Sequence, residues 1–314
     1  MELSILDALR ENISKVLIGN EETTELLLAA LLARGHVLLE DMPGTGKTML
    51  AKSIARSVDA DFGRIQFTPD LLPSDVTGLN YFDSQKGAFV FAPGPAFRNI
   101  LLADEINRAT PKTQSSLLEC MEERQITVDG VTRSLPEPFL VVATENPLET
   151  LGTFPLPEAQ LDRFLMQLSM ETLDKSQEVS MLLRFINNEP LQQLQPVCGR
   201  EAIIGLQEEC RRVFVHPDLL SYLSELTQAT RRHPKVACGV SPRGTLALLR
   251  ASQGCAMLAG RSYVVPEDIK KAAVPVLSHR LVLLAGTAIP HAARQIIEEV
   301  LSSTEVPTED WRER

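Results

Sequence analysis

The residues with the clearest chemical potential lie in "LLEDMPGTGKTMLAKS" (38–53), where an apolar run leads into a glycine-containing loop and then a helix. In such a loop, backbone N–H groups point at an anion, glycines allow close approach, and the helix N-terminus adds a favourable field. Lys47 would reach the β- and γ-phosphates of a nucleotide, and Thr48 would offer its hydroxyl to Mg²⁺. The stretch therefore predicts a phosphate-binding loop.

Asp41 departs from the usual loop pattern, which has glycine at this position. Two unit charges about 4 Å apart repel by roughly 4 kcal/mol at an effective dielectric constant near 20, and a penalty of that size would cripple phosphate binding. Asp41 follows the predicted strand directly and precedes the tight part of the loop. We therefore expect its carboxylate to point away from the phosphates.

A second element, "NILLADEINRA" (99–109), is an apolar strand that ends in two acids. Asp104 would accept a hydrogen bond from a magnesium-bound water or from Thr48, and Glu105 would polarise a water for attack on the γ-phosphorus. Phosphoryl transfer depends on this kind of positioning more than on covalent participation. The pair therefore predicts an acidic metal and water site beside the loop.

A polar residue after a central strand can orient the attacking water, and "VVATENP" (141–147) offers Asn146, with Thr144 as a weaker candidate. By itself this asparagine is better explained as a turn residue before a proline.

Three arginines are candidates for neutralising charge on the transferred phosphoryl group, an effect worth about 10³–10⁵ in rate in such systems. Arg163, in "LPEAQLDRF", precedes the last predicted strand and could face a neighbouring subunit's nucleotide. Arg243, in "GVSPRGT", begins a helix and could fold over the phosphates of its own chain, while Arg108 is a second candidate for the intersubunit role. Taken singly, each would also suit a surface ion pair.

The elements that must position these residues follow an alternating pattern. Five apolar runs separated by helical stretches predict a parallel sheet buried on both faces: "HVLLE" (36–40), "RIQFT" (64–68), "NILLAD" (99–104), "FLVVAT" (139–144) and "FLMQLS" (164–169). From Glu171 onward the pattern becomes helical. We predict an α/β domain over residues 1–170 and an all-α domain over residues 171–314, with protruding hairpins at 76–95 and 125–135.

The composition of the chain limits the classes of partner that it is expected to bind. The 314 residues carry a net charge of −10 with a pI of about 5.1, which disfavours nucleic acid. The five cysteines form no CxxC pair and are expected to be reduced thiols, and the histidines show no metal-binding spacing. The N-terminal stretch is typical of an amphipathic helix rather than a secretion signal, and no uncharged apolar run is long enough to span a bilayer. We expect a cytoplasmic protein.

Together these elements resemble the AAA+ ATPases and, within them, the MoxR family, and the resemblance covers most of the chain. The stretches that carry it are "RIQFTPDLLPSDVTG" (64–78), "ILLADEINRATPKTQSSLLECMEE" (100–123), "TENPLETLGTFPLPEAQLDRF" (144–164) and "YVVPEDIKKAAVPVLSHRL" (263–281). The resemblance implies a five-stranded αβα core followed by a helical lid, with ATP and Mg²⁺ as cofactors. It also implies ring assembly, usually hexameric.

The resemblance also implies roles for individual residues. Nucleotide binding would fall to Ile18, Gly19, Pro43, Gly44, Thr45, Gly46, Lys47, Thr48, Met49 and Arg243. Thr48 and Asp104 would hold the metal, Glu105 would activate water, Asn146 would be a sensor, and Arg163 would be a finger acting on the neighbouring subunit. Ile18 and Gly19 would lie against the adenine, and the two hairpins would face the ring pore or the substrate.

Proteins of this family are thought to remodel or mature client proteins, often clients with a von Willebrand factor A domain. The residues alone leave three other functional hypotheses open. They are a chelatase-like motor subunit for metal insertion, a nucleotide-gated scaffold with little hydrolysis, and a nucleic-acid motor, which the acidic composition disfavours.

Overall fold

The computed structural model describes residues 4–40, 44–146, 152–285, 291–308 and 311–312. Contacts divide the chain into two compact units. The first contains Met1–Thr24, His36–Leu156 and Ser169–Ile204, and the second contains Glu25–Gly35, Pro157–Leu168 and Gly205–Arg314. The predicted boundary between residues 170 and 171 stays a prediction, because these units interleave along the chain.

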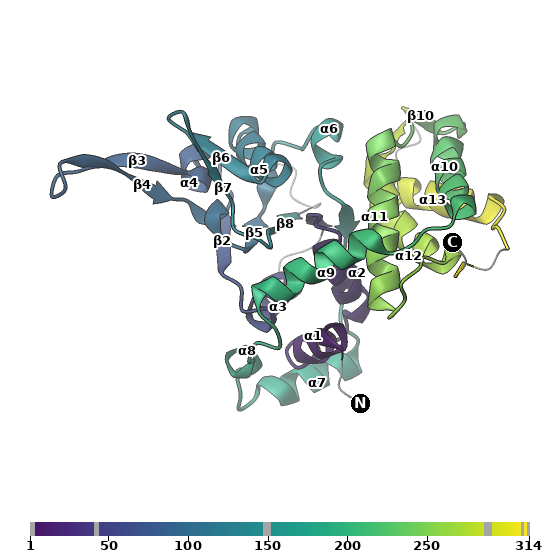
Figure 1. Ribbon diagram of the computed structural model, residues 1–314, viewed down its shortest axis with the longest axis horizontal. Helices are drawn as coiled ribbons and strands as arrows, with labels where there is room; N and C mark the ends of the chain where they lie inside the picture. The colour runs from purple at the N-terminus through teal and green to yellow at the C-terminus, as the bar shows by residue number, and fades with distance from the viewer. Residues whose placement is uncertain (1–3, 41–43, 147–151, 286–290, 309–310, 313–314) are drawn as a thin grey trace. The chain divides into compact units, whose positions relative to one another are not determined.

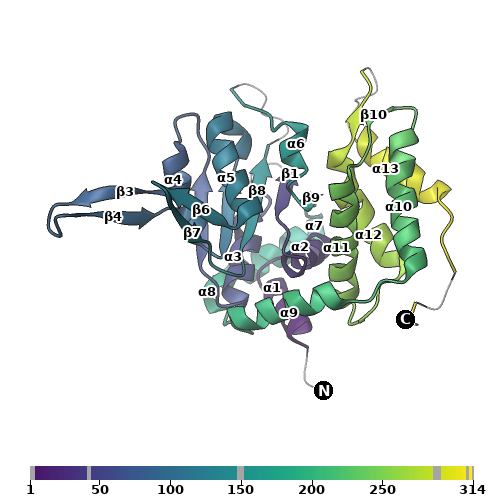
Figure 2. The same cartoon turned by 45° about the horizontal axis from the view of Figure 1, so that its top comes forward.

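A five-stranded sheet runs in the order β2-β5-β8-β1-β9; β2, β5 and β8 are labelled in Figure 1, and β1, β8 and β9 in Figure 2. Its strands are β1 (Val37–Glu40), β2 (Phe62–Gln66), β5 (Ile100–Asp104), β8 (Leu140–Glu145) and β9 (Met166–Leu168). The pairs β2–β5, β5–β8 and β1–β8 are parallel, and every residue of β5 is buried. Continuous apolar runs of this kind suit a sheet covered on both faces, so the predicted five-stranded parallel sheet is confirmed.

The helical segments of the first unit lie between and after these strands. They are α1 (Ile5–Ser14), α3 (Lys47–Ser57), α4 (Pro73–Thr77), η1 (Pro95–Phe97), η2 (Ile106–Arg108), α5 (Pro111–Glu123), α7 (Lys175–Phe185) and α8 (Pro190–Gln193). The helix α3 begins directly after the predicted phosphate loop and buries one apolar stripe that includes Leu50 and Ile54. Its start is therefore held at the carboxyl end of β1, where a nucleotide loop must lie.

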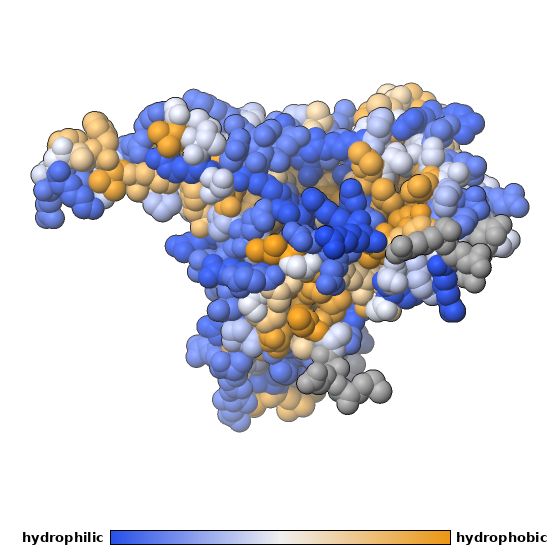
Figure 3. Space-filling model, viewed as in Figure 1, coloured by the Kyte–Doolittle hydropathy of each residue, from blue (hydrophilic) through white to orange (hydrophobic). Residues whose placement is uncertain are grey.

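Both predicted hairpins are present. β3 (Gly78–Asp83) pairs antiparallel with β4 (Ala88–Pro93), and β6 (Gln125–Val128) pairs with β7 (Val131–Ser134). The second turns at Asp129 and Gly130, both with positive φ, as an Asp-Gly hairpin turn requires. The β3–β4 hairpin extends from its sheet in both views and carries apolar side chains at its surface (Figures 1, 2 and 3). Phe82 is 57% exposed and Phe89 is 74% exposed.

The second unit is mainly helical. It contains α6 (Glu158–Leu161), α10 (Pro217–Arg232), α11 (Pro242–Leu258), α12 (Pro266–Leu277), η3 (Ser278–Arg280) and α13 (Ala292–Ser303), while α2 (Glu21–Leu32) and α9 (Arg200–Arg212) have residues in both units. The prolines that open α10, α11 and α12 occupy first-turn positions, where a missing N–H costs nothing. A short ladder of β10 (Val236–Cys238) and β11 (Val282–Leu283) was not predicted.

Within the described residues, no helix has both the length and the apolar character needed to cross a membrane.

Candidate active site

The phosphate loop depends on two glycines with left-handed backbone. Gly44 has φ of +90° and Gly46 has φ of +100°, a region that residues with a Cβ rarely adopt. Gly46 is also the N-cap of α3, and no side chain in the described part of the chain caps this helix. A helix N-terminus that is not capped by a side chain is the arrangement that phosphate sites use.

The two acids follow the central strand. Asp104 ends β5 and is buried, whereas Glu105 adopts φ of 55° and ψ of 52° immediately after it. Left-handed backbone is costly for a side chain such as glutamate and is concentrated at functional sites. The left-handed backbone at Glu105 therefore marks the end of β5 as a candidate functional site.

Thr144 on the neighbouring strand β8 holds both acids. Its hydroxyl accepts a 2.9 Å hydrogen bond from the backbone N–H of Glu105 and lies 3.4 Å from the Asp104 carboxylate as a donor. Thr144 is 1% exposed, so this contact is shielded from water. Sequence reasoning treated Thr144 as an alternative to Asn146, but the structure places it beneath the acids.

Several of the predicted residues line one cavity of about 330 Å³, a size suited to a small ligand. Its lining consists of Gly44, Gly46, Lys47, Thr48, Met49, Arg64, Gln66, Asp104, Glu105, Thr144, Glu145 and Asn146. The loop, both acids and the predicted sensor Asn146 are thus brought together. Ile18, Gly19 and Thr45 are described by the structure and lie outside this lining.

Three lining residues, Arg64, Gln66 and Glu145, were not predicted from the sequence. Arg64 Nε lies 2.6 Å from Asp104 Oδ2, and Gln66 Nε2 donates to Glu105 Oε2 at 2.6 Å. Both come from β2, whose register with β5 places Gln66 opposite Asp104. The signal in the sequence is the pair of long polar side chains in "RIQ", but it has meaning only when the pairing of β2 with β5 is known.

Residues 36–166 match a family described as "ATPase family associated with various cellular activities (AAA)", and residues 228–300 match "AAA lid domain". The chaperone MoxR1 of Mycobacterium tuberculosis is 38% identical over 98% of this chain and 83% of its own length. The chain belongs to the MoxR family of AAA+ ATPases.

Other relatives agree with this assignment. The protein YeaC of Bacillus subtilis is 49% identical over 95% of this chain and 94% of its own length, and MoxR of Paracoccus denitrificans is 33% identical over 85% and 86%. A crystal structure of a Cytophaga hutchinsonii protein has a TM-score of 0.90 and 38% identity, covering 97% of this chain and 95% of that one. The predicted fold, a MoxR-type αβα core with a helical lid, is confirmed.

The donor set of this MoxR family member fits Mg²⁺ and a phosphate group. The carboxylate of Asp104 and the hydroxyl of Thr48 are oxygen ligands of the kind a hard cation prefers. Lys47 and the N-terminus of α3 supply positive charge and N–H donors for phosphate. Among the described His, Cys, Asp and Glu side chains, no separate metal-binding group occurs, and all five cysteines are free.

A second carboxylate pair affects the electrostatics of the cavity. Glu145 lies opposite Glu40 in the β1–β8 register. Burial, and after it the charge of Glu40, raises the pKa of Glu145 to about 7. The cavity wall therefore gains negative charge as pH rises through neutrality.

Two predicted arginines lie in the other unit of the MoxR chain. Arg163 follows α6, and Arg243 is the second residue of α11, whose N-cap is Ser241. Their actions on nucleotide stay predictions. Asp41 and Pro43 lie outside the described residues, so the predicted direction of the Asp41 carboxylate also stays a prediction.

Proposed function

We propose that the chain binds and hydrolyses Mg²⁺-ATP at the cavity between the α3 N-terminus and the β5 acids. The observation that carries this proposal is the convergence of Lys47, Thr48, Asp104 and Glu105 on a single cavity. Independent sequence segments contribute these residues, and their types are those that phosphoryl transfer to water requires.

Each residue then has a separate task. Lys47 and the α3 N–H groups bind and orient the phosphates, and Thr48 with Asp104 holds the metal. Magnesium, when bound, neutralises charge on the phosphates. Glu105 orients a water and takes up its proton, and Asn146, directly after β8, positions the same water. Because Gln66 and Thr144 hold the Glu105 segment, its direction is set before nucleotide arrives.

The proposal extends to a ring of identical chains, with a hexamer as the expected size. Arg163 would neutralise charge at a neighbouring protomer's nucleotide, and Arg243 would contact the nucleotide of its own chain. The ring would remodel or mature client proteins, and the name of the relative MoxR1, a chaperone, supports this role. Clients with a von Willebrand factor A domain are the first class to test.

The exposed aromatic residues of the β3–β4 hairpin support a role in client contact. Phe82 and Phe89 form an edge-to-face pair with ring centroids 5.5 Å apart, yet both are largely exposed. Aromatic residues in such a position provide apolar contact area for an extended polypeptide.

Substitution Glu105→Gln tests the hydrolytic site. Because the amide keeps the shape of the side chain but not its basicity, the variant should bind ATP with normal affinity and lose turnover by about 10²-fold or more. Calorimetry measures binding and phosphate release measures turnover, with Glu119→Gln, an exposed position on α5, as the matched control. Normal turnover in Glu105→Gln would refute the role given to this residue.

The shared site is tested by mixing. Arg163→Ala should slow turnover steeply, and adding a Lys47→Ala variant should restore part of it, because intact arginines would then meet intact pockets. The absence of any recovery would argue against a nucleotide shared between protomers.

A further inference from the structure

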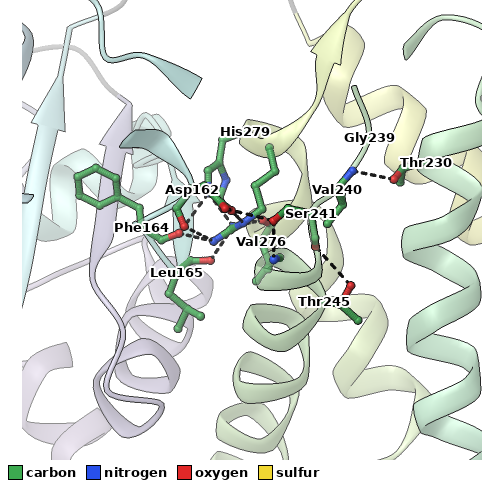
Figure 4. Close-up of polar contacts among 12 residues, drawn as sticks. Asp162, Phe164, Leu165, Thr230, Gly239, Val240, Ser241, Thr245, Val276 and His279 are labelled. Carbon is green, nitrogen blue, oxygen red and sulfur yellow. Dashed lines mark hydrogen bonds and ion pairs between the residues drawn. The ribbon is translucent and has the colours of Figure 1, made fainter. Parts of the chain in front are cut away.

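Asp162, the residue before Arg163, makes contacts with two other parts of the second unit (Figure 4). Its Oδ1 receives a 2.7 Å hydrogen bond from Arg280 Nε, at the end of η3. Its Oδ2 receives a 3.2 Å hydrogen bond from Ser241 Oγ, the N-cap of α11. One carboxylate therefore joins the segment of Arg163 to the helix that begins with Arg243.

Arg280 attaches to the backbone on both sides of Arg163. Its Nη2 donates to the carbonyl of Asp162 at 3.2 Å and to that of Phe164 at 2.6 Å, and its Nη1 donates to the carbonyl of Leu165 at 3.2 Å. The Arg280 side chain is only 3% exposed. A guanidinium with several fixed donors is suited to hold a backbone turn in one conformation, which an ammonium group cannot do as well.

The start of α11 is shaped to accommodate Arg280. A Cβ on Gly244 would lie 2.8 Å from Arg280 Cδ and 2.5 Å from Val240 Cγ1, both closer than real side chains approach. Gly244 has ordinary helical backbone, so the reason for glycine here is space rather than φ. The helix end that carries Arg243 and the side chain of Arg280 are thus in direct contact.

Arg243 also acts on Arg280 electrostatically. Burial lowers the pKa of the Arg280 guanidinium, the charge and hydrogen bond of Asp162 raise it, and the positive charge of Arg243 lowers it further. The Asp162 carboxylate offsets this repulsion. If Arg243 moves toward a phosphate, the charge balance around Arg280 changes.

We propose that Asp162 and Arg280 form a positioning pair that couples the orientation of Arg163 to that of Arg243. Through this pair, the nucleotide state sensed by Arg243 in one protomer would set the position of Arg163 at the neighbouring nucleotide. The inference rests on the roles given to these two arginines under the proposed function. It adds Asp162, Arg280, Ser241 and Gly244 as residues that transmit the signal without touching nucleotide.

The test uses Asp162→Asn and Arg280→Lys in the full chain. The first removes the negative charge, and the second keeps the positive charge but loses the forked contacts. Each variant should bind ATP within about twofold of the parent affinity and should show kcat lowered at least tenfold with KM little changed. Mixing either variant with Lys47→Ala should restore turnover, because only the protomer that supplies Arg163 is defective.

The matched control is Asp268→Asn, which breaks another buried ion pair of the same unit, Asp268 Oδ1 with Arg261 Nη2 at 2.6 Å. If a variant is slow only because its fold is destabilised, mixing it with Lys47→Ala should not raise its turnover. Asp268→Asn provides the reference for this outcome. Recovery of Asp162→Asn or Arg280→Lys beyond this control supports the positioning role.

Parallel measurements on Arg163→Ala distinguish failure of the positioning pair from failure of the proposed function. Suppose that Arg163→Ala is slow and is rescued by mixing. If both pair variants then keep the parental kcat, or if both are slow and mixing does not rescue them, the positioning pair is overturned and the proposed function stands. If Arg163→Ala itself keeps full turnover, the trans role of Arg163 and the inference built on it are both overturned.

Discussion

The amide of Gln66 donates a 2.6 Å hydrogen bond to the carboxylate of Glu105, joining the end of β2 to the turn after β5. Arg108 contacts the same carboxylate oxygen, with its Nε at 3.0 Å from Oε2. Glu105 is therefore held from two sides at the cavity, although its own backbone is in an unfavourable region. Under the proposed function, Glu105 restrained in this way is ready to orient water and is sensitive to the loss of either partner.

Substitution Gln66→Leu should lower kcat roughly tenfold while leaving ATP affinity unchanged. A hydrogen bond to a charged group contributes about 1.5–3 kcal/mol, and each 1.4 kcal/mol lost only in the transition state is a factor of ten. Steady-state phosphate release and calorimetric ATP titration measure the two quantities. A rise in kcat would instead show that Gln66 restrains Glu105 from its catalytic position.

Gly244→Ala should destabilise the second unit by about 1–3 kcal/mol, because the added methyl group overlaps Arg280 Cδ and Val240 Cγ1. Gly205→Ala, on α9, is the matched control, since a Cβ there meets nothing within 4 Å. In this control the free energy of unfolding should rise by about 0.5–1 kcal/mol, because alanine is normally more stable than glycine inside a helix. Urea unfolding measures the free energy of unfolding of both variants. Equal changes in this free energy would contradict the steric explanation of Gly244.

The raised pKa of Glu145, about 7 against an ordinary value of 4.5, predicts a pH-dependent loss of stability. Between these values the folded protein keeps a proton that the unfolded chain has released, so stability from this residue falls as pH rises from 4.5 to 7. The free energy of unfolding falls by about 3 kcal/mol over this whole pH range. In nucleotide-free protein, Glu145→Gln should therefore stabilise the fold at pH 8 and have little effect at pH 4.5.

The matched control for that experiment is Glu119→Gln, which removes a carboxylate from an exposed position on α5 outside the cavity. Glu40→Gln should shift the midpoint of the Glu145 titration downward, because it removes the second cause of the raised pKa. A stability difference for Glu145→Gln that does not change with pH would disprove the assignment.

His36 predicts the opposite trend with pH. It is buried, its Nε2 lies 3.0 Å from the carbonyl of Met121, and its Nδ1 accepts from the N–H of Val141 at 2.9 Å. Burial, followed by the charge of Arg124, lowers its pKa from 6.5 to about 3. The unfolded chain takes up a proton below pH 6.5 and the folded chain does not, so stability falls by roughly 1.4 kcal/mol per pH unit down to about pH 3.

His36→Gln should remove this slope while keeping one donor and one acceptor at the site. His291→Gln, which removes an imidazole from an exposed position, is the matched control. The comparison needs stability differences between variant and parent at each pH, because the Glu145 and His36 contributions partly cancel between about pH 4.5 and 6.5. An unchanged slope in His36→Gln would show that another group is responsible.

Much of the nucleotide site could be predicted from local sequence. The loop around Gly44 and Gly46, the strand that ends in Asp104, and the Asp-Gly turn at 129–130 each have signals within a few residues. Local backbone preferences and apolar periodicity act over this range, so such patterns identify element types without knowledge of the fold. The β10–β11 ladder was missed because two- and three-residue strands carry almost no periodicity.

The sequence by itself predicted a phosphate-binding loop, a pair of acids at the end of an apolar strand and a parallel sheet that carries them. Only the tertiary structure decided which partners hold them, because those partners are distant in the chain. Gln66 and Glu105 are 39 residues apart, and Asp162 and Arg280 are 118 residues apart. Such contacts depend on strand register and side-chain packing across whole elements, and no local pattern specifies either.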